Sequence, residues 1–343
     1  MPTRSVFHRG LRHQYRLIGV LLSLLVLSAS AIGLSYTSAR AATNNNPVLP
    51  GYNADPQIAV FNNTFYMYPT TDGIASWGAT SFQAWSSIDM IHWTNHGVIL
   101  DLAKVSWCHA NAWSPSIAKR GSTYYFYFTA CSEIGVATSS SPTGPFTDAL
   151  GKPLVSTNQY TVHSIDPAVF IDTNGQPYLL FGNGGARLGK LNANMTSFSG
   201  TPANITPGGA SYREAPYMFK RNGTYYLTWS DDDTRNVTYH VSYAKASAIT
   251  GPFTAASGNP ILSENTSLGI LGTGSASIWG ASTGQYYIVY HRFAIPGGDG
   301  THREVAIDPL NFNSDGTIQH VAVSLTGLSS AVSPNPNNPL AEA

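Results

Sequence analysis

The sequence carries little charge and no excess of either sign. Only 10% of its residues are charged, and 18 Lys and Arg residues balance 18 Asp and Glu residues. A protein without a basic surface lacks the electrostatic field that attracts nucleic acid, so we expect no nucleic-acid partner. Aromatic residues make up 12% of the chain, and tyrosine is the most frequent of them. Rings with a polar tip suit a neutral ligand that carries hydroxyl groups.

Long apolar runs are absent after residue 34. Residues 1–16 hold arginines and no acidic residue, residues 17–34 are almost wholly apolar or small, and Ala39-Arg40-Ala41 offers a cleavage site. This order is typical of a secretory signal peptide, so residues 1–41 are predicted to be removed and the protein to be secreted to the extracellular medium. The alternative is an uncleaved membrane anchor, since the apolar run nearly spans a bilayer. After cleavage we expect no contact with a membrane.

Cysteine is scarce as well. The sequence has two cysteines, Cys108 and Cys131. Both lie in the exported part, where disulfides form, so a single Cys108–Cys131 disulfide is the economical prediction. Two free buried thiols are the alternative.

Helical periodicity is nearly absent after residue 45, and short aromatic and β-branched runs alternate with turn residues instead. Five segments repeat one outline: a small or acidic residue, often a proline, then an apolar strand, a turn and an aromatic strand. Their first strands begin near Asp55, Ser114, Asp166, Glu214 and Ser275. Tyrosines of the second strands recur at intervals of 48 to 61 residues. This period predicts an all-β, five-bladed β-propeller over residues 46–325, followed by a loose C-terminal tail over 326–343.

Three of the five repeats begin with a carboxylate. The first strands of a propeller line its central channel, so Asp55, Asp166 and Glu214 are predicted to converge at one mouth. Glycoside hydrolysis needs one protonated carboxyl group for the leaving oxygen and one ionised carboxylate for water. Acids on different blades leave room for that water, which favours inversion, and a third carboxylate would raise the pKa of the acid. A turn-forming role before proline is the alternative for either aspartate alone.

The motifs around these residues resemble those of glycoside hydrolase family 43, and most closely its exo-acting α-L-arabinofuranosidase branch. The resemblance runs from about Asn46 to Leu325. It rests mainly on Asn53-Ala54-Asp55-Pro56, Ala112-Trp113-Ser114-Pro115, Ser164-Ile165-Asp166-Pro167, Arg213-Glu214-Ala215-Pro216 and Tyr290-His291-Arg292. It implies a secreted inverting hydrolase that releases L-arabinofuranose from arabinan or from arabinose-bearing plant cell-wall polysaccharides and oligosaccharides.

The resemblance also implies roles for single residues. Asp55 would be the general base, Glu214 the general acid, and Asp166 the residue that tunes the pKa of the acid and orients the sugar. Trp113 and Trp77 would bind substrate, although a core tryptophan is the alternative for Trp113.

Two further roles come from the same resemblance. Arg303 would reach the central acids, against the alternative of an exposed loop arginine. His291 would face a possible structural calcium ion in the central channel, while no cofactor is required for the chemistry. Ser275 and Ala276 stand where many relatives have histidine, which weakens the implied metal site.

Other activities stay open within and beyond this family. Its β-xylosidases, endo-arabinanases and exo-β-1,3-galactanases are alternatives, but the galactanases typically lack the aspartate base that Asp55 provides here. A non-catalytic sugar-binding propeller is the alternative from a different class. Such a protein would keep the aromatic rings but need not keep all three acids.

Overall fold

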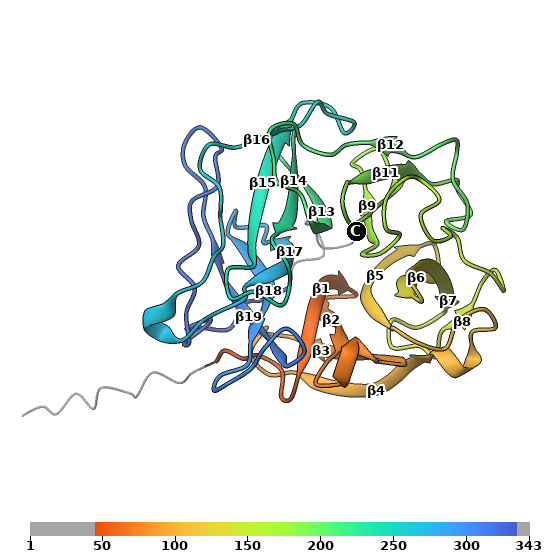
Figure 1. The fold of residues 1–343 in the computed structure, drawn as a ribbon, viewed down its shortest axis with the longest axis horizontal. Coiled ribbons are helices and arrows are strands. Elements are labelled where there is room, and N and C mark those ends of the chain that lie inside the picture. The colour runs from red at the N-terminus through yellow and green to blue at the C-terminus, as the bar shows by residue number, and fades with distance from the viewer. Residues whose placement is uncertain (1–44, 335–343) are drawn as a thin grey trace, which may run out of the picture. The chain divides into compact units, whose positions relative to one another are not determined.

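Five small antiparallel sheets are arranged around a common centre in the computed structural model (Figure 1), which describes residues 45–334. This arrangement confirms the predicted all-β, five-bladed β-propeller. Helical structure within 45–334 is limited to short 3-10 turns, and no helix there is long and apolar enough to cross a membrane. The predicted signal peptide, residues 1–41, lies outside the described residues.

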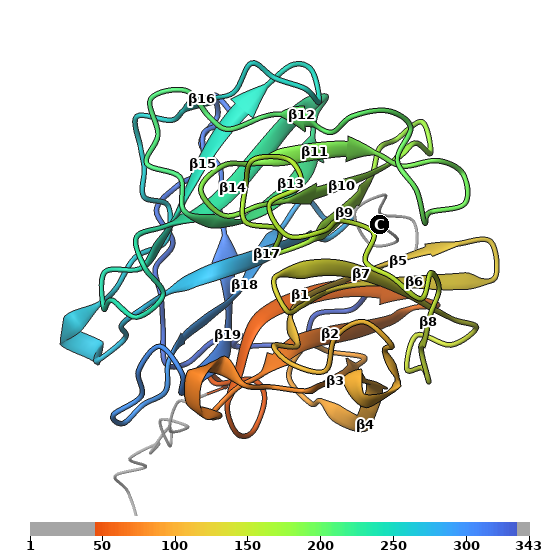
Figure 2. The same ribbon diagram turned by 45° about the vertical axis from the view of Figure 1, so that its right-hand side comes forward.

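Four blades have four strands each, and the fifth has three (Figure 2). Blade 1 consists of β1 (Asn53–Phe61), β2 (Thr64–Thr71), β3 (Ser81–Ser87) and β4 (Thr94–Asp101). Blade 2 consists of β5 (Trp113–Arg120), β6 (Thr123–Ala130), β7 (Glu133–Ser139) and β8 (Thr147–Asp148). Blade 3 consists of β9 (Ala168–Ile171), β10 (Pro177–Phe181), β11 (Arg187–Lys190) and β12 (Ala203–Asn204). Blade 4 consists of β13 (Glu214–Arg221), β14 (Thr224–Asp231), β15 (His240–Ala246) and β16 (Thr254–Ala255), and blade 5 of β17 (Gly274–Gly280), β18 (Tyr286–Phe293) and β19 (Arg303–Leu310).

The aromatic second strands supply the packing between blades. Tyr68 on β2 and Phe82 on β3 contact Phe126 on β6, with ring centroids 5.8 and 5.3 Å apart. All three side chains are fully buried. Aromatic rings bury large areas and pack well at their edges, so this interface accounts for part of the aromatic content of the chain.

The first described residues close the ring by packing on blade 5. The Val48 N–H donates to the Val305 carbonyl at 2.9 Å, and the Asn46 side-chain oxygen accepts from the Ile307 N–H at 2.9 Å. Both partners lie on β19, the outer strand of the three-stranded blade. The start of the propeller therefore pairs with its last strand.

The C-terminal segment also packs on the propeller, further than the sequence predicts. Residues 326–334 were expected to form part of a loose tail, but Leu328 is buried and the Val332 N–H donates to the Asp89 carbonyl at 3.0 Å. Leu328 joins an apolar cluster with Trp279 and Val289 of blade 5. Residues 335–343 lie outside the described range.

A ring of hydrogen bonds joins each blade to the next at the channel mouth. In every blade one residue near the start of the first strand has a positive φ: Asp55, Ser114, Asp166, Ala215 and Ser275. The backbone N–H of each donates to a side chain of the preceding blade. The acceptors, in that order, are His291 Nδ1 at 3.2 Å, Thr70 Oγ1 at 2.7 Å, Thr129 Oγ1 at 3.1 Å, Asp166 Oδ2 at 3.0 Å and Ser230 Oγ at 2.8 Å.

The blade 3–4 link differs from the other four for a steric reason. Elsewhere the acceptor stands on the second strand of the preceding blade, and in blade 3 the matching residue is Gly182, whose N–H donates to Ile165. A Cβ atom on Gly182 would lie 2.2 Å from the Gly185 carbonyl oxygen, so no side chain fits there. The Asp166 carboxylate replaces it and binds the Ala215 N–H.

This ring corrects one feature of the repeat alignment. Asp55 and Asp166 occupy equivalent positions, but the equivalent residue in blade 4 is Ala215, and Glu214 precedes it by one residue. Neighbouring residues of a strand point to opposite sides, so the offset gives Glu214 a different direction from the two aspartates. Below these residues the channel contains a cavity of about 30 Å³, which is lined by three consecutive residues of each blade.

Candidate active site

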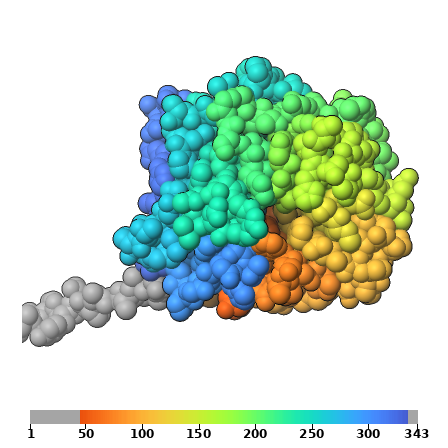
Figure 3. Space-filling model, viewed as in Figure 1, coloured from red at the N-terminus to blue at the C-terminus, as the bar shows by residue number. Residues whose placement is uncertain are grey.

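A pocket of about 320 Å³ lies above the start of the first strands. The space-filling view shows the molecule hollowed near the point where the blades meet (Figure 3). Its lining brings together six of the seven candidate residues: Asp55, Trp77, Trp113, Asp166, Glu214 and Arg303. The pocket therefore unites residues from all five blades at the place that the repeat predicted.

Asp55 is buried among groups that favour its ionised form. Its Oδ2 accepts from the Thr70 hydroxyl at 2.8 Å, and its Oδ1 lies 3.4 Å from the Arg303 guanidinium and 3.2 Å from His291 Nδ1. Burial alone would raise the pKa of Asp55, but Arg303, His291 and Thr70 outweigh it and hold the pKa below the ordinary value. A carboxylate that stays ionised is suited to accept a proton from water.

Arg303 is held in place by a residue that the sequence did not single out. Its guanidinium binds Asp72 through Nε at 2.8 Å and through a second nitrogen at 3.2 Å, and its backbone N–H donates to the same carboxylate at 3.0 Å. Both side chains are buried. This two-point contact fixes the guanidinium beside Asp55, as the resemblance implied for Arg303.

Glu214 has an environment of the opposite kind. Its Oε2 accepts from the Asn183 amide at 2.6 Å, its Oε1 accepts from the Tyr239 hydroxyl at 3.0 Å, and Arg213 lies 3.9 Å away. Burial raises the pKa of Glu214, and the contacts with Tyr239, Arg213 and Asn183 offset only part of that rise. A carboxyl group that retains its proton is suited to be a general acid.

Asp166 is the third carboxyl group that lines the pocket, together with Asp55 and Glu214. Burial, followed by the charges of Glu214 and Asp55, raises the pKa of Asp166 well above its ordinary value. Because the carboxyl groups of Asp166 and Glu214 repel each other when ionised, the pair favours a shared proton. The Ala215 N–H bond also ties Asp166 to the residue beside Glu214. Asp166 is therefore linked to Glu214 by the repulsion between their charges and by the backbone of the residue that follows Glu214.

Two tryptophans form one side of the pocket. The Trp113 indole N–H donates to the Trp77 carbonyl at 2.6 Å, and the Trp77 indole N–H donates to the Gly300 carbonyl at 2.6 Å. Trp77 and its neighbour Ser76 both have positive φ values, of 52° and 56°, which are strained for residues with side chains. Contacts on both sides hold Trp77 in this conformation. Both rings are half-buried and line the pocket.

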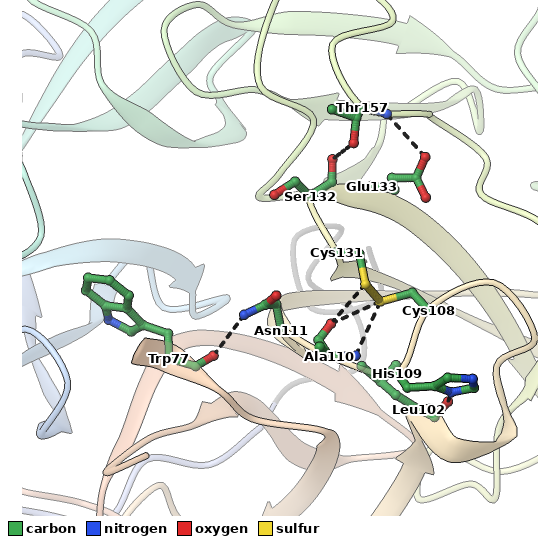
Figure 4. The surroundings of a disulfide bond; sticks show 10 residues. All are labelled: Trp77, Leu102, Cys108, His109, Ala110, Asn111, Cys131, Ser132, Glu133 and Thr157. Atoms are coloured by element: carbon green, nitrogen blue, oxygen red, sulfur yellow. Dashed lines mark hydrogen bonds between the residues drawn. A yellow bond between two sulfur atoms is a disulfide. The ribbon is translucent and has the colours of Figure 1, made fainter. Parts of the chain in front are cut away.

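The disulfide supports this side of the pocket. Cys108 and Cys131 are bonded, as predicted, and both sulfur atoms lie near the Ala110 carbonyl (Figure 4). The next residue, Asn111, donates to the Trp77 carbonyl at 3.5 Å. The bond thus ties the segment that carries Asn111 to the turn between β6 and β7.

His291 lies beside Asp55, and the structure does not place it in the pocket lining. Its ring is fully buried, stacks on Tyr239 and accepts the Asp55 N–H, while its Nε2 has no hydrogen-bond partner. Within residues 45–334 no group of three or more His, Cys, Asp or Glu side chains converges as metal ligands do. Calcium takes six to eight oxygen ligands, so the His291 nitrogen could not hold the implied calcium ion by itself, and the calcium site stays a prediction.

The site residues that sequence reasoning missed stand at the ends of second strands or in the loops that follow. Thr70 is the last residue but one of β2, Asn183 follows β10, and Tyr239 precedes β15. Antiparallel pairing returns each second strand to the mouth where the first strand began, so the repeat itself carried a signal for Thr70 and Asn183. The sequence gives no comparable indication for Asp72, because its role depends on Arg303, which is distant in the sequence.

Comparisons with known proteins agree with this geometry. The family model described as "Glycosyl hydrolases family 43" matches residues 44–318. A β-D-galactofuranosidase of Aspergillus niger is 35% identical, covering 89% of this chain and 92% of its own. An arabinoxylan arabinofuranohydrolase of Bacillus subtilis is 30% identical, covering 93% of this chain and 72% of its own. The solved structure of an α-L-arabinofuranosidase from Clostridium thermocellum superposes with a TM-score of 0.67 at 31% identity, covering 80% of this chain and 95% of its own.

Proposed function

Because the chain belongs to glycosyl hydrolase family 43 and is therefore a glycoside hydrolase, we propose that it releases terminal L-arabinofuranose from arabinan or arabinose-bearing plant polysaccharides, with inversion. The observation that carries the proposal is the contrast between two largely buried carboxyl groups in one pocket, whose side chains are 14% and 13% exposed. The pKa of Asp55 is lowered and the pKa of Glu214 is raised. Two carboxyl groups with opposed protonation are what glycoside hydrolysis requires.

In this mechanism Asp55 activates water. The carboxylate accepts a proton from a water molecule, which attacks the anomeric carbon from the blade 1 side. Arg303 and Thr70 hold the carboxylate in position through the contacts described above, and the His291 ring accepts the Asp55 backbone N–H. The water forms the new C–O bond as the glycosidic C–O bond breaks, so the configuration at that carbon inverts.

Glu214 completes the reaction on the opposite side of the sugar. It donates its proton to the departing glycosidic oxygen, which leaves as a neutral hydroxyl group of the next sugar. Asp166 keeps the proton on the pair and, by holding the Ala215 N–H, keeps Glu214 in position. The Trp77 and Trp113 rings offer apolar faces to the sugar ring.

The preference for a furanose comes from the names of the relatives. Arabinofuranose-releasing enzymes and a galactofuranosidase are both found among these relatives. The rings of α-L-arabinofuranose and β-D-galactofuranose have the same configuration and differ only in the length of the exocyclic chain. β-D-Galactofuranosidase is therefore the second candidate function, and the 35% identity to such an enzyme favours it.

We also propose that the enzyme is secreted. The disulfide between Cys108 and Cys131 supports this, because such bonds form and persist in oxidising compartments. N-terminal sequencing of the protein from culture medium tests the proposal. A mature chain that begins near residue 42 supports cleavage, and a cell-bound protein that retains residues 1–41 contradicts it.

Product analysis tests the proposed substrate. The purified protein is incubated with arabinan, arabinoxylan, and the nitrophenyl glycosides of α-L-arabinofuranose and β-D-galactofuranose, with Asp55→Asn as an inactive control. We expect free arabinose as the first product. Preferential release of galactose selects the second candidate, early release of oligosaccharides indicates endo cleavage, and binding without release indicates a sugar-binding protein.

A further inference from the structure

Groups of different kinds hold the two oxygens of the Glu214 carboxyl group. Oε2 accepts the Asn183 amide N–H at 2.6 Å and is the oxygen that the Arg213 guanidinium approaches, at 3.9 Å. Oε1 accepts the Tyr239 hydroxyl at 3.0 Å. An amide N–H and a guanidinium can only donate, whereas a hydroxyl can donate or accept. The carboxyl group therefore meets donors alone at Oε2 and a reversible partner at Oε1.

This asymmetry decides which oxygen carries the proton when Glu214 is protonated. A proton on Oε2 would face an N–H group that cannot accept it, and its positive end would lie close to the Arg213 cation. A proton on Oε1 leaves Oε2 as the carbonyl oxygen, which is the better acceptor for the Asn183 amide. The Oε1–H group can also be donated to the Tyr239 oxygen. These contacts therefore favour the protonated form with hydrogen on Oε1.

The Tyr239 side chain is held firmly enough for its hydroxyl to act in this way. Its ring lines the pocket but is only 1% exposed, and it stacks on His291 with the centroids 5.6 Å and the planes 4° apart. Gly274 packs so closely on the ring that a side chain there would collide with it. Ser230 is a second hydrogen-bond partner for the hydroxyl group. The hydroxyl hydrogen can thus turn from Oε1 to Ser230 without any movement of the ring.

We propose that Tyr239 is a positioning residue for the catalytic proton: its hydroxyl oxygen accepts the Oε1–H group of Glu214 in the free enzyme, and its O–H donates to Oε1 once the proton has left. The inference rests on the proposed role of Glu214 as general acid. During the reaction the Oε1–H bond breaks and the proton goes to the glycosidic oxygen, which keeps the electron pair of the broken C–O bond. Glu214 becomes a carboxylate, and the Tyr239 O–H turns toward Oε1 and stabilises the new charge.

Infrared spectroscopy tests the position of the proton without any substrate. The C=O stretch of a protonated carboxyl group moves to lower frequency when its carbonyl oxygen accepts a hydrogen bond. The Glu214 band is the one that Glu214→Gln removes from the difference spectrum between low and high pH. With the proton on Oε1, Asn183→Leu should move this band to higher frequency and Tyr239→Phe should leave it nearly in place. A band that moves in Tyr239→Phe and not in Asn183→Leu would place the proton on Oε2 and overturn the inference.

Kinetics on two leaving groups test what the hydroxyl contributes to the reaction. Tyr239→Phe keeps the ring that stacks on His291 and removes one hydrogen bond to a group that becomes charged. We expect kcat/KM to fall about tenfold on an arabino-oligosaccharide but less than about twofold on the dinitrophenyl arabinofuranoside, whose leaving group needs no proton. Equal losses on both substrates would give Tyr239 a purely structural role and contradict the proposal.

Tyr243→Phe is the matched control for this comparison. Tyr243 is another buried tyrosine of blade 4, and its hydroxyl accepts the Ile318 N–H at 3.1 Å instead of contacting a carboxyl group of the pocket. The control variant also loses one hydrogen bond, so it reports the cost of that loss to the fold. Its kcat/KM should be unchanged on both substrates.

The pH–rate profile gives a readout that a structural role would not move. Burial raises the pKa of Glu214, and the Tyr239 hydroxyl opposes that rise by favouring the carboxylate. The other ionisable groups that face Glu214 stay in place in Tyr239→Phe: Asp55, Asp166, Tyr212 and Arg213. The alkaline limb should therefore move to higher pH in this variant. A limb that stays or moves to lower pH contradicts the proposal.

Glu214→Ala on the same two substrates separates this inference from the proposed function. If Glu214→Ala loses activity mainly on the oligosaccharide and Tyr239→Phe shows no such difference, the inference is wrong and the general acid stands. If Glu214→Ala keeps full activity on both substrates, the proposed acid and this inference fail together. Should product analysis select galactofuranose, the same pair of leaving groups is tested on that sugar.

Discussion

Asp166→Asn and Asp166→Ala separate the two roles that the structure gives this residue. Asparagine keeps an oxygen that can accept the Ala215 N–H at the position where Asp166 Oδ2 accepts it at 3.0 Å, but it carries no charge. Alanine removes both the charge and the acceptor. The first variant therefore tests electrostatics alone, and the second adds the loss of the link between blades 3 and 4.

The Asn variant is expected to trade activity for stability. Asp166 and Glu214 repel each other when ionised and favour one shared proton, so replacing Asp166 removes the repulsion that keeps a proton on the pair, and we expect the alkaline limb of the pH–rate profile to move to lower pH. The folded pKa of Asp166 lies above the unfolded value of about 3.9, so ionising this group costs folding free energy as the pH rises above that value. Asp166→Asn should accordingly be more stable than the wild-type enzyme near pH 7 and similar to it near pH 4.

The Ala variant is expected to lose part of that gain. A missing hydrogen bond is worth about 1 kcal/mol, so its free energy of unfolding should be lower than that of the Asn variant by about that amount. Its kcat should also be lower, because Ala215 and hence Glu214 are less firmly held. The assays are kcat/KM against pH on an arabino-oligosaccharide and melting temperatures at both pH values. An alkaline limb that Asp166→Asn does not move, or identical Asn and Ala variants, would refute the reasoning.

Four other variants have defined outcomes. The activity of Glu214→Ala should fall about 10²–10⁴-fold on arabino-oligosaccharides but much less on a dinitrophenyl glycoside, because that leaving group needs no proton. Asp55→Ala should lose activity on both substrates. The reverse pattern would exchange the acid and the base. Arg303→Met leaves Asp55 and Asp72 without their cation, so we expect a loss of about 3–5 kcal/mol in the free energy of unfolding. Because the pKa of Asp55 then rises, the acidic limb of the pH–rate profile should move to higher pH. An acidic limb that does not move speaks against Arg303 as the cause of the low pKa of Asp55. The free energy of unfolding of the Cys108→Ser/Cys131→Ser variant should fall by about 3 kcal/mol, and its KM should rise because the Asn111–Trp77 contact is weakened. An unchanged KM would show that the disulfide does not support the Trp77 side of the pocket.

The fold was accessible from the sequence because the blade is a local unit that repeats. Each first strand begins at a comparable residue, and each turn and aromatic strand follows at a short distance along the chain. The convergence of Asp55, Asp166 and Glu214 follows from that repetition. The offset of Glu214 does not, because it depends on which residue adopts a positive φ, and Glu214 and Ala215 both precede Pro216 within two positions.

The supporting contacts were less accessible, since they join residues far apart in the sequence. Asp72 binds Arg303 across 231 positions, and His291 binds Asp55 across 236. Single side chains in loops carry no periodic pattern that would pair them. His291 is an example: the resemblance implied a place facing a metal ion, and the structure adds a contact that no pattern predicted, in which the ring joins blade 5 to blade 1 by accepting the Asp55 backbone N–H.

The anomeric configuration of the first product tests the central claim most directly. Proton NMR during hydrolysis of an α-L-arabinofuranoside resolves the two anomers before they equilibrate. If Asp55 activates water while Glu214 protonates the leaving oxygen, β-L-arabinofuranose appears first and the α anomer follows by mutarotation. First appearance of the α anomer would show retention through a covalent intermediate and would contradict the roles assigned to Asp55 and Glu214.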